Sequence, residues 1–321
     1  MKYVSVETHT HTVHSDAQLT VKELLEACRK AEWDAFVLTD HNTDSGMEEV
    51  PANQVSPAVI PGIEWTTFHG HVIVIAPDRF VEFRDLTTQN LDAHIDKVHD
   101  AGGVAILAHP CDPGEPFCCG CHCDFEIQRW ENVDGMEVWH EEDPDASEWN
   151  RRSKALWLKK LDEGFCITAL CASDWHVTFP EDVPFGVNYL GLDENLPVAN
   201  AVKNAIIAGR CFVTMGPTIA LSLHQKDATA GIGDTVLPGD ATLSLCFDDA
   251  QRKNVWQHYS IVPKTVAVIQ NHTETVLPFP GYGEKISVPR KLASGYIRVE
   301  LRGSLLGNPR TLLMTNPVYI R

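Results

Sequence analysis

Short apolar segments that each end in a histidine or an acidic residue constrain this chain more than any other feature of its sequence. The run 35–38 leads into Asp40 and His41, and the run 104–107 leads into His109. Helical periodicity between several such runs predicts strands that alternate with helices over the first two thirds of the chain. The ends of parallel strands converge, so these side chains are expected at one mouth of an α/β barrel or at one edge of a doubly wound sheet.

The expected elements can be placed by their residue ranges. Thr20 and Glu23 have the spacing of a capping box, and apolar residues follow at helical intervals. Gly102 and Gly164 stand where two further helices should stop. Strands are expected at 3–7, 35–38, 59–60, 72–75, 104–107, 135–139 and 166–171, and helices at 21–31, 90–101, 145–163 and 197–208.

The pattern of polar and apolar residues changes after Gly216 and Pro217. Polar and apolar residues then alternate, Gly and Pro are frequent, and long helical periods end. We therefore expect residues 1–216 to form the α/β part and residues 217–321 to form a small antiparallel β domain.

Charge and hydropathy exclude two classes of protein. The 44 acidic and 26 basic residues give a net charge of −18, which disfavours stable binding of duplex nucleic acid. No apolar run approaches the roughly 18 residues of a membrane helix. The N-terminal residues have no signal-peptide pattern, so we expect a cytoplasmic protein whose ten cysteines stay reduced.

Histidine is the over-represented residue, with 15 copies. His9 and His11 are two residues apart on an expected strand end, so both imidazoles point to the same side and can bind one metal ion. Carboxylates combined with imidazoles suit Zn, Mn or Fe better than Ca. Glu64 is a candidate to bridge two ions, because each of its oxygens can bind one. The joint pattern predicts a multinuclear metal site built from His9, His11, Asp16, His41, Glu64, His109, His140, Asp174 and His176.

Five motifs in the first 215 residues resemble the PHP (polymerase and histidinol phosphatase) family of metal-dependent hydrolases. They lie at 9–16, 38–42, 62–66, 108–110 and 172–176, in the order of that family. Gly-Ile-Glu-Trp-Thr-Thr at 62–67, followed by Gly-His-Val at 70–72, is similar to the CehA/McbA-like branch. His140 departs from that branch, many members of which have Asn there.

The resemblance implies a distorted (β/α)7 TIM-like barrel with two or three divalent metal ions in its mouth. It assigns His9, His11, Glu64 and Asp174 to a first ion, Glu64, His109 and His140 to a second, and Asp16, His41 and His176 to a third. His71 is an alternative ligand of the second ion, or a donor to the substrate oxyanion. Asp40 either orients a ligand, shuttles a proton or is only a satisfied acid at a strand end.

The implied activity is hydrolysis through metal-bound hydroxide. A phosphoesterase acting on a small phosphomonoester or nucleotide is favoured, with Arg129, Arg151 and Arg152 as candidate cations for the phosphate. An ester, amide or carbamate hydrolase with the same metal site is the alternative, and a non-catalytic metal-binding module is the second alternative. The expected partner is a small-molecule substrate, and a homodimer stays open. The thiols of Cys111 and of the run 118–123 form either an accessory zinc site or a reduced loop.

Overall fold

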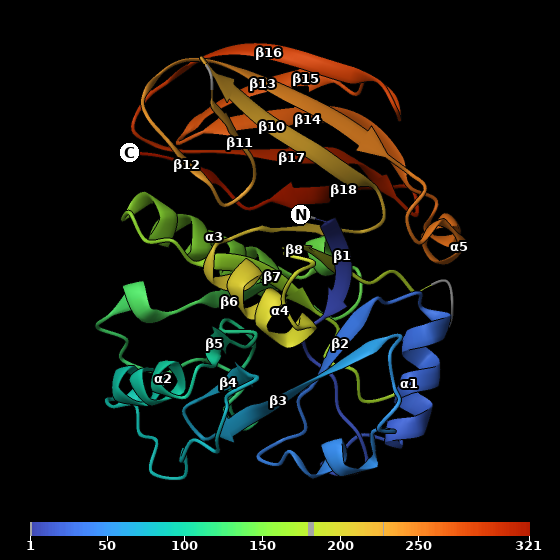
Figure 1. The fold of residues 1–321 in the computed structure, drawn as a ribbon, viewed down its shortest axis with the longest axis vertical. Coiled ribbons are helices and arrows are strands. Elements are labelled where there is room, and N and C mark those ends of the chain that lie inside the picture. Colours follow the sequence, from blue (N-terminus) through green and yellow to red (C-terminus); the bar gives the residue numbers. More distant parts are fainter. Residues whose placement is uncertain (1, 179–182, 227) are drawn as a thin grey trace.

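The structure is a computed structural model that describes residues 2–178, 183–226 and 228–321. The lower part of Figure 1 holds the strands and helices of the first two thirds of the chain. Its strands are β1 (Lys2–Glu7), β2 (Ala35–Leu38), β3 (Ala58–Thr67), β4 (Gly70–Ile75), β5 (Val104–Leu107), β6 (Gly135–His140), β7 (Thr168–Ala172), β8 (Val187–Leu192) and β9 (Cys211–Thr214). Its helices are α1 (Val21–Lys30), α2 (Leu91–Asp100), α3 (Glu148–Asp162) and α4 (Val198–Ile207).

The helices begin where their capping residues place them. The hydroxyl of Thr20 accepts a hydrogen bond from Glu23 N, and the Glu23 carboxylate accepts one from Thr20 N, so the predicted capping box starts α1. Helix α3 begins later than expected. Ser147 caps it by accepting a hydrogen bond from Asn150 N, and residues Pro144–Ala146 form a separate 3-10 turn before it.

A large sheet runs through the molecule in the order β12-β19-β17-β18-β9-β8-β1-β2-β3-β4-β5-β6-β7. Its first four strands come from the C-terminal part of the chain: β12 (Thr235–Val236), β19 (Val318–Ile320), β17 (Gly295–Leu305) and β18 (Asn308–Thr315). Within it β1, β2 and β3 are parallel to one another, and so are β5, β6 and β7. Strand β4 is antiparallel to both β3 and β5, and it follows β3 through a tight hairpin in which Thr67 pairs with Gly70. A two-residue connection can join only antiparallel strands. The alternation of strands and helices is therefore interrupted between β3 and β4, which have no helix between them.

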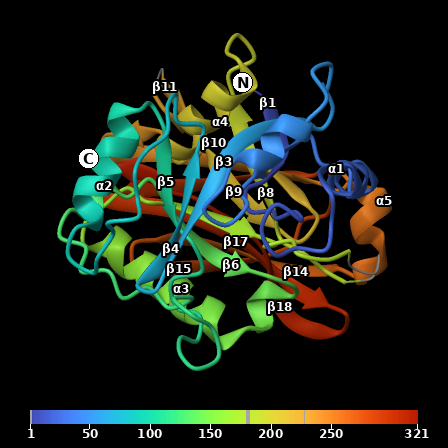
Figure 2. The same ribbon diagram turned by 90° about the horizontal axis from the view of Figure 1, so that it is seen from below.

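The ends of β1 and β7 meet beyond the strands themselves. Thr10 forms a parallel bridge with Trp175, and His11 N donates to Trp175 O at 2.9 Å. Figure 2 shows β3 to β6 near the middle of the view from below, with α1, α2, α3 and α4 toward the periphery. The bridge between Thr10 and Trp175 places the residues that follow β1 and those that follow β7 at the same end of the molecule.

The upper part of Figure 1 is made of the C-terminal strands. A separate antiparallel sheet has the order β11-β10-β13-β16, and β18 pairs with β9 of the large sheet. The bounds are β10 (Thr218–Gln225), β11 (Ala228–Ala230), β12 (Thr235–Val236), β13 (Gly239–Asp248), α5 (Lys253–Trp256), β14 (Val262–Gln270), β15 (Thr273–Pro278), β16 (Lys285–Leu292), β17 (Gly295–Leu305), β18 (Asn308–Thr315) and β19 (Val318–Ile320). The mixed α/β class with a second antiparallel sheet is therefore confirmed.

Strand β17 departs from the alternation expected of a strand with one wet face. Arg298 and Glu300 are buried together with the apolar residues between which they stand. Lys154 of α3 explains this, because its Nζ lies 2.8 Å from Glu300 Oε1 and α3 covers that face. The expected boundary between residues 216 and 217 falls between β9 and β10.

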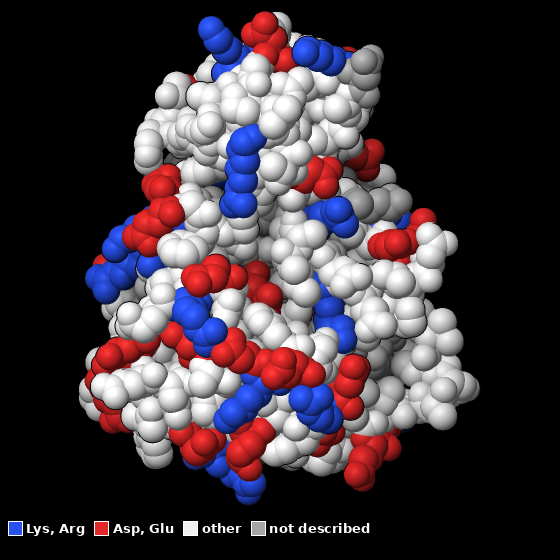
Figure 3. All heavy atoms as spheres, turned by 60° about the vertical axis from the view of Figure 1, so that its left-hand side comes forward, with Lys and Arg blue, Asp and Glu red and all other residues white. Residues whose placement is uncertain are grey.

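The surface of the molecule carries its charges unevenly. On the face shown in Figure 3, acidic and basic side chains are interspersed over the lower part, and the upper part is mostly uncharged. None of the helices in the described ranges is both long enough and apolar enough to span a membrane.

Candidate metal centre

The structure brings the nine predicted metal ligands together at the ends of the strands. Every strand from β1 to β7 except β4 contributes at least one of them. They are His9, His11 and Asp16 after β1, His41 after β2, Glu64 in β3, His109 after β5, His140 at the end of β6, and Asp174 and His176 after β7.

Glu64 lies at the middle of the cluster and is fully buried. Its Oε2 lies 2.6 Å from His41 Nδ1 and 3.4 Å from His9 Nε2. Its Oε1 lies 3.0 Å from His71 Nδ1 and 3.4 Å from His109 Nε2. His11 Nε2 also lies near Oε2, at 3.5 Å. The two oxygens of one carboxylate thus face two different sets of imidazoles, which is the arrangement expected of a bridging ligand.

Asp174 lies between the pair His9 and His11 and the ring of His140. Its Oδ1 lies 2.8 Å from His11 Nε2 and 3.2 Å from His9 Nε2. Its Oδ2 lies 3.2 Å from His140 Nε2. His9, His11 and Asp174 therefore offer three ligand atoms within 4.8 Å of one another, enough for one ion.

Asp16 lies at the solvent-exposed side of the cluster, where it contacts two histidines. Its Oδ1 lies 3.0 Å from His176 Nε2 and 3.4 Å from His41 Nε2. The ring of His11 lies between theirs, with centroids 4.3 Å from His41 and 4.2 Å from His176. These four residues form one group of ligand atoms, so His11 stands between the first and third predicted sets.

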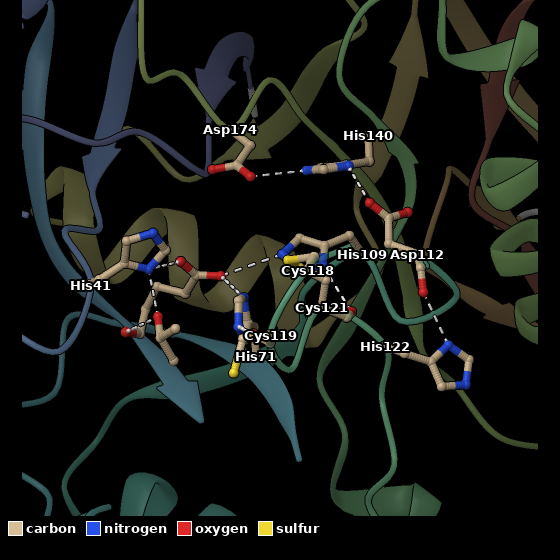
Figure 4. Close-up of a disulfide and its surroundings, with 12 residues drawn as sticks. His41, His71, His109, Asp112, Cys118, Cys119, Cys121, His122, His140 and Asp174 are labelled. Carbon is tan, nitrogen blue, oxygen red and sulfur yellow. Dashed lines mark hydrogen bonds and ion pairs between the residues drawn. A yellow bond between two sulfur atoms is a disulfide. The ribbon is translucent and has the colours of Figure 1, made fainter. Parts of the chain in front are cut away.

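His109 has a neighbouring histidine on either side. Its ring centroid lies 5.0 Å from that of His71 and 4.7 Å from that of His140. His140 faces Asp174, as Figure 4 shows. His71 instead faces Glu64, with its Nδ1 3.0 Å from Oε1. Both predicted alternatives for the second ion are thus in place beside His109.

The outward nitrogens of two histidines are held by buried or half-buried carboxylates. Glu137 Oε1 lies 2.9 Å from His9 Nδ1, and Glu137 Oε2 accepts a hydrogen bond from His109 N at 2.9 Å. Asp112 Oδ2 lies 3.1 Å from His140 Nδ1. A carboxylate on the outer nitrogen fixes the tautomer in which the inner nitrogen has a free lone pair, as metal-binding histidines require.

Sequence reasoning missed Glu137, Asp112 and a third carboxylate, Glu7. Glu7 Oε1 accepts hydrogen bonds from His9 N at 3.1 Å and Ser173 N at 3.2 Å, and therefore ties the end of β1 to the end of β7. The signal was present: Glu7 follows Val6 at the end of β1, and Glu137 stands between Met136 and Val138 in β6. Buried acids in such positions need partners, and here the partners belong to the cluster.

The electrostatics of the cluster favour a cation. Burial raises the pKa of Glu64, but the nearby His9 and the other histidines around it lower it more, so that it lies well below its ordinary value. The pKa of Asp174 is likewise depressed by His9 and His11 against the effect of burial. Burial lowers the pKa of His9, yet the surrounding acids raise it well above its usual range. Positive charge is stabilised here, whether it comes from a proton or from a metal ion.

Two of the ligands have strained backbones. His109 has φ of 27° and Asp174 has φ of 48°, both in a region that residues other than glycine rarely occupy. Such conformations persist where the surroundings hold them, and they concentrate at functional sites.

Several buried polar atoms of the cluster have no hydrogen-bond partner among the described residues. An unsatisfied buried polar atom costs about 1–3 kcal/mol, so a group of them that converges needs an explanation. Divalent ions bound here would supply it, because these atoms are the usual ligands of Zn, Mn and Fe. They are His9 Nε2, His11 Nδ1 and Nε2, Glu64 Oε1 and Oε2, His71 Nδ1 and Asp174 Oδ1.

The two predicted catalytic residues take different places. His71 belongs to the cluster, through its contact with Glu64. Asp40 instead anchors the loop that follows β1: its carboxylate accepts hydrogen bonds from Thr12 N at 2.7 Å, Thr12 Oγ1 at 2.8 Å and Ser15 Oγ at 2.8 Å. This geometry fits both an orienting role and that of a satisfied acid at a strand end.

The candidate phosphate-binding arginines are engaged elsewhere. Arg129 pairs with Asp96, and Arg152 pairs with Glu148 on the surface of α3. Arg151 donates to Ala146 O. Within the described ranges, none of these contacts reaches a ligand of the cluster.

The cysteines depart from the expectation that all would be reduced. Cys118 and Cys121 form a disulfide, and the other eight cysteines have free thiols. The disulfide lies beside His109 and His71, as Figure 4 shows. The two Cα atoms lie 5.5 Å apart, within the range that a disulfide needs, and composition alone does not reveal this proximity.

Comparison with solved structures supports the fold. A two-domain protein from Bacteroides vulgatus, described as containing a predicted PHP-like metal-dependent phosphoesterase, matches with a TM-score of 0.52 and 13% identity over 99% of this chain and 95% of its own. At that identity the likeness concerns the fold, across both parts of the chain. No family model matches this sequence, and no curated protein matches it either.

Two further structures resemble a smaller part of the chain. One, from Bifidobacterium adolescentis, is inferred to be a metal-dependent phosphoesterase (TM-score 0.40, 19% identity, 63% of this chain and 95% of that one). The other is an amidohydrolase from Chromobacterium violaceum with bound sulfate and no metal (TM-score 0.39, 16% identity, 64% and 96%).

Proposed function

We propose that this chain is a metal-dependent hydrolase, and that its substrate is a small phosphomonoester or nucleotide. The position of Glu64 carries the proposal, because its two oxygens face separate sets of imidazoles, His9, His11 and His41 on one side and His71 and His109 on the other. A shared carboxylate holds two ions a few ångströms apart, the spacing that suits displacement at phosphorus. The PHP-like fold of the Bacteroides vulgatus protein is consistent with this activity.

Each residue has a separate task in this proposal. His9, His11 and Asp174 would hold one ion, His109 with His71 or His140 a second, and Asp16, His41 and His176 a third. Divalent ions bound there would lower the pKa of water and polarise the ester oxygen. Glu137, Asp112 and Glu7 hold the ligands in position.

The exposure of the ligands indicates where substrate enters. The side chains of His9 and His11 are fully buried, whereas those of His176 and Asp16 are 31% and 62% exposed. A substrate therefore reaches the cluster from the side of Asp16, His41 and His176. These residues would contact the leaving part of the substrate or the phosphate itself.

The test is hydrolysis by purified protein loaded with Mn²⁺, on p-nitrophenyl phosphate, nucleotide monophosphates, aryl esters and aryl carbamates. Glu64→Gln should lower the rate by at least about a hundredfold, and Glu131→Gln, an exposed acid outside the cluster, should not change it. Phosphate release that depends on Glu64 supports the phosphoesterase. Cleavage of esters or carbamates alone would move the assignment to the carboxylic ester, amide or carbamate class. A metal-loaded protein that cleaves none of them would contradict the proposal for this panel.

We further infer that residues 1–216 form a distorted (β/α)7 barrel and residues 217–321 a second unit. The bridge between Thr10 and Trp175 and the hydrogen bond from Thr8 Oγ1 to Cys171 O support a closed ring of strands. Limited proteolysis that cuts first near residue 217 and releases a stable N-terminal fragment would support the division.

A further inference from the structure

The loop from Cys111 to Cys123 is packed against the metal centre. Cys111 bridges to His122 across the loop, and Cys123 N donates to Pro110 O at 3.1 Å. A Cβ on Gly120 would lie 1.8 Å from Thr67 O, so the loop touches the β3–β4 hairpin with no room for a side chain there. The loop is therefore fixed beside the strands that carry Glu64 and His71.

The backbone of this loop orients two histidines of the centre. His71 Nε2 lies 3.3 Å from Cys119 O, and His109 Nδ1 lies 3.2 Å from Cys121 O. A carbonyl only accepts, so each of these ring nitrogens donates. The lone pairs of His71 Nδ1 and His109 Nε2 then point inward, where both atoms face Glu64 Oε1.

A sulfur atom completes this group. The ligand atoms of His71, His109 and Cys121 all lie within 4.8 Å of one another. Ligands at 2.0–2.3 Å from one ion lie no more than roughly 4.6 Å apart, so small shifts bring all three to a single ion. His71 Nδ1 is buried and has no hydrogen-bond partner among the described residues, which independently indicates that a ligand belongs here.

We propose that Cys121 is a fourth ligand of a metal ion held by Glu64, His71 and His109, and that reduction of the Cys118–Cys121 disulfide makes this ligand available. Figure 4 shows the disulfide next to both histidines. Two imidazoles, one carboxylate oxygen and one thiolate form a complete tetrahedral set for Zn²⁺. With the disulfide closed, the same ion has three protein ligands and one open position.

The redox step is balanced by a dithiol reductant. The reductant passes two electrons and two protons to the Cys118–Cys121 bond and becomes a disulfide itself, and both cysteines become thiols. Cys121 then loses its proton to solvent as its sulfur binds the divalent ion. The disulfide thus determines whether the ion has a closed or an open coordination shell. The inference rests on the proposed metal centre but not on its substrate.

Co²⁺ binding tests the inference without measuring activity. Thiolate bound to Co²⁺ gives a near-ultraviolet charge-transfer band, which imidazole and carboxylate ligands do not give. We expect the full chain treated with dithiothreitol and then freed of it to show the band, and protein kept with oxidised glutathione to lack it. Zn²⁺ release to a chelator should be about 10–100-fold slower from the reduced protein.

Three cysteine variants separate the possible outcomes. Cys121→Ser should lack the band under both conditions, Cys118→Ser should show it in the absence of both reductant and oxidised glutathione, and Cys119→Ser, an exposed neighbour, should behave as the unmodified chain. Co²⁺ bound with no thiolate band in the reduced protein would overturn the inference and leave the hydrolase proposal intact. Protein that binds no Co²⁺ in either state would overturn both. Circular dichroism identifies any variant that has not folded.

Discussion

Glu137 Oε1 lies 2.9 Å from His9 Nδ1, and both side chains are almost completely buried. The carboxylate comes from the middle of β6 and the imidazole from the end of β1. A buried acid inside the sheet thus controls which nitrogen of a predicted metal ligand is free to bind an ion.

Replacing Glu137 should weaken metal binding without removing a ligand. Glu137→Gln keeps the size of the side chain but can present an amide nitrogen to His9 Nδ1, which favours the wrong tautomer. We expect metal affinity to fall about 10–100-fold, measured by competition with a chromophoric chelator. Glu131→Gln is the matched control, and equal affinities for the two variants would contradict the assigned role.

Removing the metal should lower the stability of the whole chain. Ions that bind only the folded state stabilise it by about 2.7 kcal/mol at a hundred times their dissociation constant. Chelation should therefore lower Tm by several degrees in scanning calorimetry. The same treatment of Glu64→Gln should produce a much smaller shift, because its bridging carboxylate is already lost. A chelator shift of equal size in both proteins would argue against Glu64 as a ligand.

Glu300 should make stability depend on pH. Burial raises its pKa, but Lys154 and Arg298 lower it more, and the net pKa lies well below the ordinary value. A depressed carboxylate pKa contributes stability above the unfolded value, about 4.3, and this stability is lost as the pH falls below it. Glu300→Gln should cost about 3 kcal/mol of unfolding free energy at pH 7, because it leaves buried cations unpaired.

Urea denaturation at pH 7 and pH 3 measures that effect. The difference between the unmodified chain and Glu300→Gln should shrink at the lower pH. Glu274→Gln is the control: Glu274 pairs with Arg302 in the same network but is half-exposed, so its loss should cost less than about 1 kcal/mol. Similar costs for both variants would show that burial of Glu300 is not what matters.

Two substitutions of Asp40 distinguish a role in orienting the metal-binding loop from a role in proton transfer. Asp40→Ala removes the acceptor for Thr12 and Ser15, so the loop that carries Asp16 should lose its anchor and metal binding should weaken by at least about tenfold. Asp40→Asn retains one acceptor oxygen and should recover much of the loss. If Asp40 instead moved a proton, the pH profile of kcat would lose a limb in Asp40→Asn while metal binding stayed unchanged.

The sequence allowed much of this centre to be predicted, for a simple reason. A histidine at the end of an apolar strand is visible in one dimension, and strand ends converge in three, so the set containing His9, His109 and Asp174 could be assembled without coordinates. The acids that support it were harder to find. Glu137 lies inside a strand, and only the pairing of β6 with its neighbours shows which ligand it serves.

The fold was predictable to the level of its class. Capping residues and buried runs gave α1 and β2 with small errors, but the antiparallel position of β4 depends on pairing with both β3 and β5. Burial of β17 on both faces depends on α3, as the contact between Lys154 and Glu300, 146 positions apart in the chain, shows. Local periodicity does not contain such information.

The hydrogen bond between Ser173 and Glu7 spans 166 positions of the chain. Contacts of this sequence separation form late, because the entropy of closing so large a loop must be lost before they contribute any energy. The histidines after β1 are synthesised first, but Asp174 contacts them only after β7 has packed beside β1. Metal uptake should therefore report completion of folding, and the ion cannot serve as an early template for it.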